Sequence, residues 1–348
     1  MFTALGSCML ALYGLLSVSS AQCSNEVAAQ NQGLRTASAN NTWMIVPVPK
    51  AACQKALDAT YGLTIANLFG IPGLTIGRSL VVLAGLPTSD ETLFPKGFPE
   101  GFHPVLVDTS YQSDIRMSAF KIPDDALLGG GLYIPYAHRA TIIGGNPNTI
   151  VQAPISAYLT GPKGNFVAGL VPALVSTFIE GYFLRLASVI PNDAAFRRND
   201  NNILSNSVSW LVGPNPASGP GVIPTAYDLQ YIEQDKFNLY TAKLFKAVIN
   251  QPSILQGPAL FSGNMCQRNQ YYYRNDTSTM IPVTGNLTFG PAADGLTIIN
   301  PSIIQKASPD GDGIYRGNEG FRGCGQNVGF NPEKCDVAVQ KVDQAALE

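Results

Sequence analysis

Glycine and proline interrupt this sequence at short intervals, and their spacing limits what the chain can fold into. Its 348 residues include 34 glycines and 25 prolines, with short apolar runs between them. This punctuation excludes coiled coils and long helical bundles, and it is typical of short strands joined by turns. Hydrophobic residues make up 45% of the chain, which is enough for a substantial core in one large domain.

The apolar runs predict a mainly antiparallel sheet with a few helices. A strand at Trp43–Val48 leads into a helix over Lys50–Tyr61, because Cys53, Leu57 and Tyr61 are spaced by four residues. Further strands are expected at Ser79–Leu83, Val105–Val107, Ile115–Phe120, Leu132–Tyr136, Ala140–Ile143, Ser205–Val212, Tyr227–Glu233, Tyr271–Arg274, Ile281–Phe289 and Leu296–Ile304. Short strands separated by turn residues pair most readily with their neighbours in antiparallel order.

Three other segments have a helical or mixed pattern. Leu170–Ile190 predicts a helix followed by a buried strand, and its charged Glu180 and Arg185 argue against a membrane span. The apolar spacing in Phe237–Val248 predicts an amphipathic helix. Asn331, followed by a proline, is expected to cap a C-terminal helix.

The N-terminus has the pattern of a secretory signal peptide. An apolar stretch and then small residues predict a signal over residues 1–21, a small and polar leader over 22–42, and one α+β domain over 43–348. The N-x-S/T sequons at Asn40, Asn275 and Asn286 are glycan acceptors if the protein is secreted by a eukaryote. The sequence therefore predicts a secreted glycoprotein.

Cysteine usage agrees with an oxidising compartment. Five cysteines follow the signal, at Cys23, Cys53, Cys266, Cys324 and Cys335, and none lies in a C-x-x-C pair. Five residues form at most two bridges, and we predict a local bridge between Cys324 and Cys335. Buried cysteines that serve only as small apolar residues are the alternative. The pairing of the other three is open.

Several classes of function lack their residues. The formal net charge is -2 and no basic cluster is present, so we expect no nucleic-acid partner. The G-x-S-x-G, H-E-x-x-H and P-loop motifs are absent, and the chain has two histidines, His103 and His138. Asp310-Gly-Asp312 is interpreted as a turn, and the glycines at 129–131 precede a strand, unlike a dinucleotide-binding loop. We predict no metal and no cofactor.

Two polar segments stand out, Asp108–Arg116 and Gly263–Arg274. Alternation along a strand places Gln112, Asp114 and Arg116 on one face of the first segment. The candidate site takes Asp114 and Tyr111 as catalytic residues and, as substrate-binding residues, Arg116, Tyr133, Arg268, Tyr271 and Tyr273. A surface ion pair and ordinary core tyrosines are the competing interpretations.

Several segments resemble the acetoacetate-decarboxylase-like group, including its secreted fungal members. They lie between residues 43 and 289 and read WMIVPVPKAACQKAL, FPKGFPEGFHPVLV, YQSDIRMSAF, GGGLYIPYA and AYLTGPKGNFVAGLVP. The resemblance implies an α+β fold with a mainly antiparallel, barrel-like sheet and a few flanking helices. It also implies Lys163 as an imine-forming lysine, although the family's second lysine is replaced by Gly164.

Together these features predict a secreted enzyme that transforms a small hydrophobic metabolite of polyketide or terpenoid type. The chemistry expected is that of a lyase or cyclase: dehydration, cyclisation, cycloaddition or decarboxylation in a barrel pocket. A non-catalytic secreted protein that binds a lipid or pigment is the alternative, and a structural cell-wall component is a third possibility. The sequence leaves the oligomeric state open.

Overall fold

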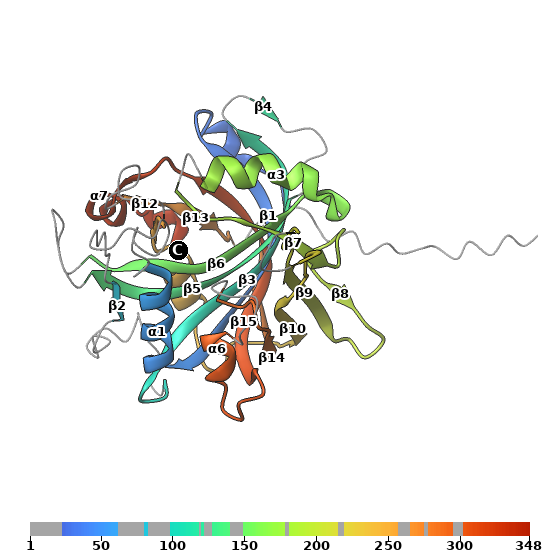
Figure 1. The fold of residues 1–348 in the computed structure, drawn as a ribbon. Helices are drawn as coiled ribbons and strands as arrows, with labels where there is room; N and C mark the ends of the chain where they lie inside the picture. The colour runs from blue at the N-terminus through green and yellow to red at the C-terminus, as the bar shows by residue number, and fades with distance from the viewer. Residues whose placement is uncertain are drawn as a thin grey trace, which may run out of the picture.

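Nine of the described strands join edge to edge in a closed ring (Figure 1). They belong to a computed structural model that describes residues 23–61, 80–82, 98–117, 120–121, 127–139, 149–177, 181–214, 219–256, 265–274, 278–294 and 302–348. In ring order they are β1 (Arg35–Pro49), β3 (Phe102–Met117), β5 (Leu127–Arg139), β6 (Val151–Thr160), β7 (Arg185–Ile190), β9 (Leu204–Trp210), β10 (Thr225–Glu233), β14 (Ile281–Phe289) and β15 (Ile314–Gly329). Only β6 and β7 are parallel within this ring. The predicted α+β fold with a mainly antiparallel, barrel-like sheet is confirmed.

The long strand β1 begins earlier than the sequence indicated. It starts at Arg35, within the polar leader expected over residues 22–42. The polar residues before Trp43 are buried, and several of their side chains hydrogen-bond to barrel partners. The Thr42 hydroxyl lies 2.7 Å from that of Tyr231, and the Asn41 amide donates to the Tyr273 hydroxyl at 2.9 Å. A polar sequence is therefore part of the barrel wall.

Shorter strands extend the barrel at its edges. β11 (Ser253–Ile254) runs parallel to β6 and is followed across the sheet by β12 (Met265–Gln267) and β16 (Glu333–Lys334). β13 (Asn269–Tyr272) pairs with the end of β15. The remaining short strands are β2 (Leu80–Val82) beside β5, β4 (Phe120–Lys121) beside β3 and β8 (Arg197–Arg198) beside β9.

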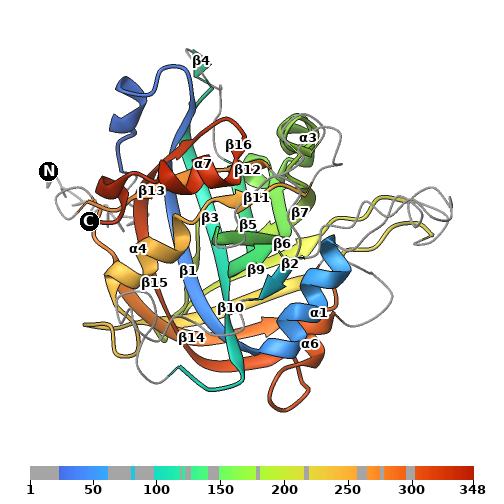
Figure 2. The ribbon, with the colours of Figure 1, turned by 90° about the vertical axis from the view of Figure 1, so that its left-hand side faces the viewer.

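Five α-helices of the described chain lie around the barrel (Figure 2). They are α1 (Lys50–Tyr61), α3 (Phe166–Val175), α4 (Ala242–Ile249), α6 (Ile303–Lys306) and α7 (Cys335–Gln340). α1 and α6 pack side by side, and α3 lies over β6 and β7. None of the helices in the described ranges is both long and apolar enough to cross a membrane.

Most predicted elements are present, with shifted bounds. α1 and β14 have the predicted bounds. α4 starts at Ala242, after the expected Phe237, because Glu319 accepts hydrogen bonds from three preceding backbone N–H groups and Thr241 caps the helix. α7 starts at Cys335 because the two residues before it pair with β12. The strand expected at Ala140–Ile143 lies outside the described residues, as does most of that expected at Leu296–Ile304, whose last two residues begin α6.

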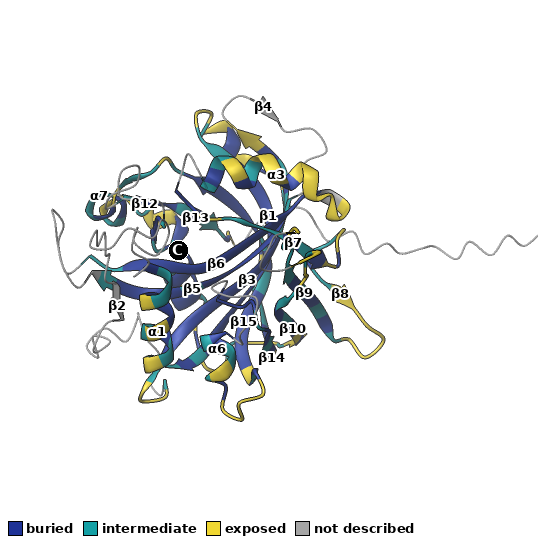
Figure 3. Cartoon of the chain, viewed as in Figure 1, coloured by how far each residue is buried: buried dark blue, intermediate teal, exposed yellow. Residues whose placement is uncertain are grey.

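The main core is formed largely by side chains of the barrel strands, most of whose residues are buried (Figure 3). Met44, Leu132, Tyr158, Tyr227 and Phe289 come from five different strands and are almost completely buried. Burying one side chain of this size contributes about 1.5–3 kcal/mol. Residues far apart in the sequence therefore hold the barrel closed.

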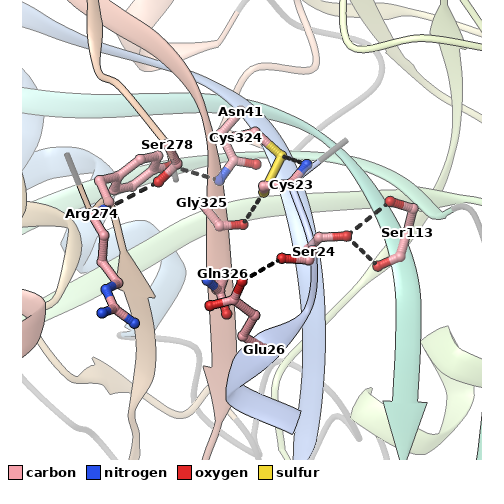
Figure 4. Close-up of a disulfide and its surroundings, with 12 residues drawn as sticks. Cys23, Ser24, Glu26, Asn41, Ser113, Arg274, Ser278, Cys324, Gly325 and Gln326 are labelled. Atoms are coloured by element: carbon pink, nitrogen blue, oxygen red, sulfur yellow. Dashed lines mark hydrogen bonds between the residues drawn. A yellow bond between two sulfur atoms is a disulfide. The ribbon is translucent and has the colours of Figure 1, made fainter. Parts of the chain in front are cut away.

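Two disulfides connect distant parts of the chain. Cys23 bonds to Cys324 (Figure 4). Cys266 bonds to Cys335, while Cys53 is buried and forms no disulfide. The predicted Cys324–Cys335 bridge is wrong, because β15 continues in extended form to Gly329. Those five residues carry the chain roughly 16 Å away from Cys324.

Candidate active site

A cavity of about 390 Å³ lies between helix α3 and the sheet face of β3, β5 and β6. Ser110, Leu127 and Ala157 line it from the sheet, and Val171 lines it from α3. Cavities of roughly 300–1,000 Å³ with mainly apolar walls and a few polar groups are typical of small-molecule sites. The cavity is therefore the candidate active site.

A bulge in β3 decides which of its side chains reach the cavity. Ala37 of β1 faces both Asp114 and Ile115, and Asp114 adopts a left-handed φ of 45°. Ser110 and Gln112 line the cavity before the bulge, and Ile115 and Met117 line it afterwards. The extra residue therefore changes which side chains of the strand face the cavity.

Asp114 and Arg116 do not line the cavity, contrary to their predicted roles. The bulge places them at the surface as an ion pair at 3.1 Å, with side chains 28% and 45% exposed. The alternation that grouped them with Gln112 does not continue through the bulge. The competing interpretation, a surface ion pair, describes them better.

Asp108 is the acidic group of the cavity. It is 4% exposed, and among the described residues its Oδ1 atom has no hydrogen-bond partner. Burial raises the pKa of Asp108 to about 7, although hydrogen bonds with the Tyr133 hydroxyl and the Gly131 backbone lower it. Near neutral pH this carboxyl group can both take up and release a proton, as a general acid/base must.

Besides Tyr158, three tyrosines line the cavity and interact with the charge of Asp108: Tyr133, Tyr182 and Tyr271. Burial raises the pKa of each phenol, and the negative charge of Asp108 raises it further. The phenols therefore stay protonated and can donate hydrogen bonds to an oxygen of a ligand. Trp43 packs behind two of them, with its ring centroid 6.3 Å from Tyr133 and 5.3 Å from Tyr271. The predicted substrate-binding residues Tyr133 and Tyr271 thus lie in the cavity wall.

The glycines at 129–131 make room for these phenols. A Cβ atom on Gly131 would overlap the ring and hydroxyl of Tyr133, and one on Gly130 would overlap the hydroxyl of Tyr227. That Tyr227 hydroxyl donates to the backbone oxygen of Asp108 at 2.8 Å. The glycine run therefore allows the barrel to pack tyrosines around Asp108.

Among the described residues, Arg35 is the one cation that lines the cavity. Its Nη2 atom donates to Asn269 Oδ1 at 2.7 Å. Its positive charge lowers the pKa of Tyr182 and Tyr271, against the larger effect of burial. The cavity thus combines one carboxyl group, one guanidinium group and several phenols within apolar walls.

The other predicted site residues lie away from the cavity. Tyr111 packs against the main core. Tyr273 is buried, and its hydroxyl accepts hydrogen bonds from Asn41 and Trp43. The remaining two are cations, Arg268 and Lys163. Arg268 donates to Glu333 at 2.7 Å and stacks on Phe330, while Lys163 is exposed in the turn before α3. None of these four side chains therefore lies where it could contact a ligand in the cavity.

The structure separates the three sequons. Asn40 is 6% exposed in β1, and its burial argues against a glycan there. Asn286 is exposed, whereas Asn275 lies outside the described residues.

Among the residues that the structure places, no group of three or more His, Cys, Asp or Glu side chains could hold a metal. The Nε2 atom of His103 lies 2.8 Å from the Pro135 oxygen, and burial lowers its pKa to about 4.

Asp108, Tyr182 and Arg35 are the cavity residues that sequence reasoning missed. Asp108 opens the polar segment from which Asp114 was chosen, and it lines the cavity whereas Asp114 does not. The sequence alone does not show which of Asp108 and Asp114 is buried, because their burial depends on strands β1 and β5 on either side of β3.

Comparison with known proteins adds distant structural likenesses. No family model matches this chain, and no curated protein matches it. A solved acetoacetate decarboxylase-like enzyme from Sphingomonas wittichii RW1 is similar with a TM-score of 0.39 and 8% identity, over 87% of this chain and 93% of that chain. The enduracididine biosynthesis enzyme MppR, complexed with the condensation product of pyruvate and imidazole 4-carboxaldehyde, is similar with a TM-score of 0.36 and 10% identity, over 86% and 88%. The first bears the family name that the sequence segments suggested.

Proposed function

We propose that this protein is an enzyme that transforms a small hydrophobic metabolite by lyase or cyclase chemistry, with Asp108 as the general acid/base. The observation that carries the proposal is the buried Asp108 carboxyl group, with its unpartnered Oδ1 atom in an apolar cavity. A carboxyl group placed there for structure alone would be expected to have all its hydrogen bonds satisfied. Dehydration and cyclisations that involve proton transfer both use such a group.

The surrounding side chains suit a substrate that carries oxygen on a hydrocarbon body. Phenols at Tyr133, Tyr182 and Tyr271 can stabilise negative charge that develops on a substrate oxygen. Leu127, Val171 and similar side chains offer apolar contact to the rest of the molecule. A polyketide or terpenoid alcohol or ketone has this combination of groups.

Imine chemistry at Lys163 is not part of this proposal. A Schiff-base lysine needs a desolvated pocket to lower its pKa, and Lys163 is exposed to solvent. No lysine lines the cavity in the described part of the chain. Decarboxylation through a covalent intermediate therefore has no support from the site.

The test compares Asp108→Asn with Asp114→Asn, a matched change of an acid in the same strand. The purified proteins are incubated with an extract from a producing strain that lacks the gene, and products are separated by mass and isomer. We expect wild type and Asp114→Asn to convert a compound, and Asp108→Asn to lose about 10²–10⁴-fold of the rate. If wild type retains a compound unchanged, the protein is a binding protein, and the enzyme proposal is wrong.

We also propose that the protein is secreted after removal of residues 1–21. The two disulfides are consistent with an oxidising compartment, and exposed Asn286 is accessible to glycosylation. Protein recovered from culture medium should begin at Gln22 and carry a glycan at Asn286 but none at Asn40. N-terminal sequencing and glycopeptide mapping check this, and full-length protein found only inside cells would contradict it.

A further inference from the structure

Helix α3 turns an apolar side toward the solvent (Figure 3). Five of its ten residues have apolar side chains that are 37% to 65% exposed: Phe166, Val167, Leu170, Val171 and Leu174. At 3.6 residues per turn these positions lie within an arc of about 140°, and we call them the apolar strip. A helix on a protein surface normally carries charged or polar side chains on its outer side, and α3 has none.

The apolar strip cannot turn inward, because the other two sides of α3 are occupied. Gly169 and Ala173 are buried where the helix packs on β6 and β7. A Cβ atom on Gly169 would lie 3.1 Å from the Cα atom of Thr160, so the helix lies directly on the end of β6. The remaining side lines the cavity through Ala168, Pro172 and Val175. The fold therefore holds the apolar strip in contact with the solvent.

The apolar strip leads into the cavity. Val171 is 65% exposed and also lines the cavity, and the same holds for Met117 in β3, which is 44% exposed. These two side chains mark the mouth of the cavity. An apolar molecule beside α3 therefore meets apolar side chains at the surface, at the mouth and in the cavity wall.

A positive charge lies at one end of the apolar strip. Lys163, in the turn before α3, is exposed and is the single charged residue from position 140 to position 179. The Asn192 side chain donates to its backbone oxygen at 3.2 Å, which brings the segment after β7 beside it. Asp193 of that segment pairs with Arg197 at 3.4 Å. Apolar side chains together with a flanking cation suit a membrane surface with anionic headgroups.

The area of the apolar strip favours a lipid surface over a second copy of this chain. The ten residues of α3, with a rise of 1.5 Å each, span about 15 Å, and one side of a helix about 10 Å wide then covers on the order of 150 Å². A stable dimer buries about 800 Å² on each partner. Insertion into a lipid layer has no such threshold, because the gain in free energy scales with the apolar area that enters.

We propose that the apolar strip docks this protein on the surface of a bilayer that contains anionic phospholipids, with Lys163 among the headgroups and the mouth of the cavity against the lipid. Docking goes beyond the proposed function and does not depend on it. The benefit of docking rests on that function: a hydrophobic substrate dissolved in the bilayer can enter the cavity without passing through water.

The first test measures binding to vesicles of phosphatidylcholine and phosphatidylserine by sedimentation. The test variant is Phe166→Gln with Leu170→Gln, and the control variant is Ile232→Gln with Leu239→Gln. All four residues are exposed and apolar, and none lines the cavity. We expect wild type and the control variant to bind, and the test variant to bind about tenfold more weakly or less. No binding by wild type, or equal binding by the two variants, would overturn the proposal.

A tryptophan in the apolar strip detects the docking surface without any loss of binding. In vesicles made with brominated phosphatidylcholine, the added fluorescence of Phe166→Trp should be quenched, because the strip enters the lipid. That of the control Leu239→Trp should not be quenched. The signal of the two natural tryptophans is subtracted with wild type. An unquenched Phe166→Trp in bound protein would show that another surface docks, contrary to the proposal.

Two further measurements separate the lipid from other partners. Lys163→Gln should weaken binding to the mixed vesicles by about fivefold and leave binding to phosphatidylcholine alone unchanged. Gel filtration in the absence of lipid should give a monomer. A wild-type dimer that the test variant converts to a monomer would mean that a second copy covers the strip, and the proposal would be wrong.

Conversion of the compound from the extract distinguishes docking from the proposed function. Vesicle binding without any conversion would support docking and contradict the proposed function. Conversion without vesicle binding would support the proposed function and contradict docking.

Discussion

At the scale of single residues, Asp108 couples the candidate chemistry to the stability of the fold. A carboxyl group prefers to be ionised in water, and the barrel surrounds this one with aromatic and apolar side chains. Burying the carboxyl group lowers the free energy of unfolding, and the many other contacts of the surrounding strands offset this loss. Residues that reduce stability while adding reactivity are characteristic of functional sites.

The raised pKa of Asp108 predicts a specific dependence of stability on pH. The folded protein holds a proton at Asp108 up to about pH 7, whereas the unfolded chain loses it near pH 4. The free energy of unfolding of wild type, measured relative to Asp108→Asn, should therefore fall by as much as about 4 kcal/mol as pH rises from 4 to 7.

Urea unfolding of both proteins across this pH range measures the difference. His103 has a lowered pKa and destabilises the fold as pH falls, but it is present in both proteins and cancels in the comparison. A constant difference between pH 4 and pH 7 would show that Asp108 is not held protonated.

At the scale of elements, the β3 bulge has the clearest expected effect on the free energy of unfolding. Asp114 has a φ of 45°, which glycine adopts freely and a β-branched residue adopts only with strain. We expect Asp114→Val to lower the free energy of unfolding by about 1–2 kcal/mol and Asp114→Gly to change it by less than about 0.5 kcal/mol. Thermal and urea unfolding measure both variants. Equal losses would mean that the ion pair with Arg116 matters more than the backbone.

The sequence predicted helices and strands well where the spacing of apolar residues indicated them. The four-residue spacing of Cys53, Leu57 and Tyr61 gave the bounds of α1, and β14 was also correct. β15 was missed because its segment from Gly317 to Gly329 is rich in glycine and resembles a loop. Partner strands give such a segment its extended form, and they are distant in sequence.

The candidate site was predictable to a smaller extent. Tyr133 and Tyr271 were among the predicted substrate-binding residues and line the cavity. Tyr271 was chosen because tyrosines beside polar residues are typical of binding sites. Asp108 and Tyr182 were not, because their place in the cavity wall depends on burial by side chains from other parts of the chain. Reactivity of this kind depends on tertiary burial, which local pattern does not encode.

At the scale of the whole molecule, the barrel joins its first long strand to its last. β1 pairs with both β3 and β15, and Cys23 bonds to Cys324 across a sequence separation of 301 residues. Two partners on opposite sides leave β1 no free edge in the closed ring.

This closure sets a waiting time during synthesis. A ribosome adds about 5–20 residues per second, so roughly 15–60 seconds pass between the emergence of Cys23 and that of its partner. Throughout that interval one backbone edge of the nascent β1 is unpaired, and the Cys23 thiol lacks its disulfide partner. The cell that makes this protein therefore has to shield an unfinished barrel, through chaperones or oxidoreductases, until the last long strand arrives.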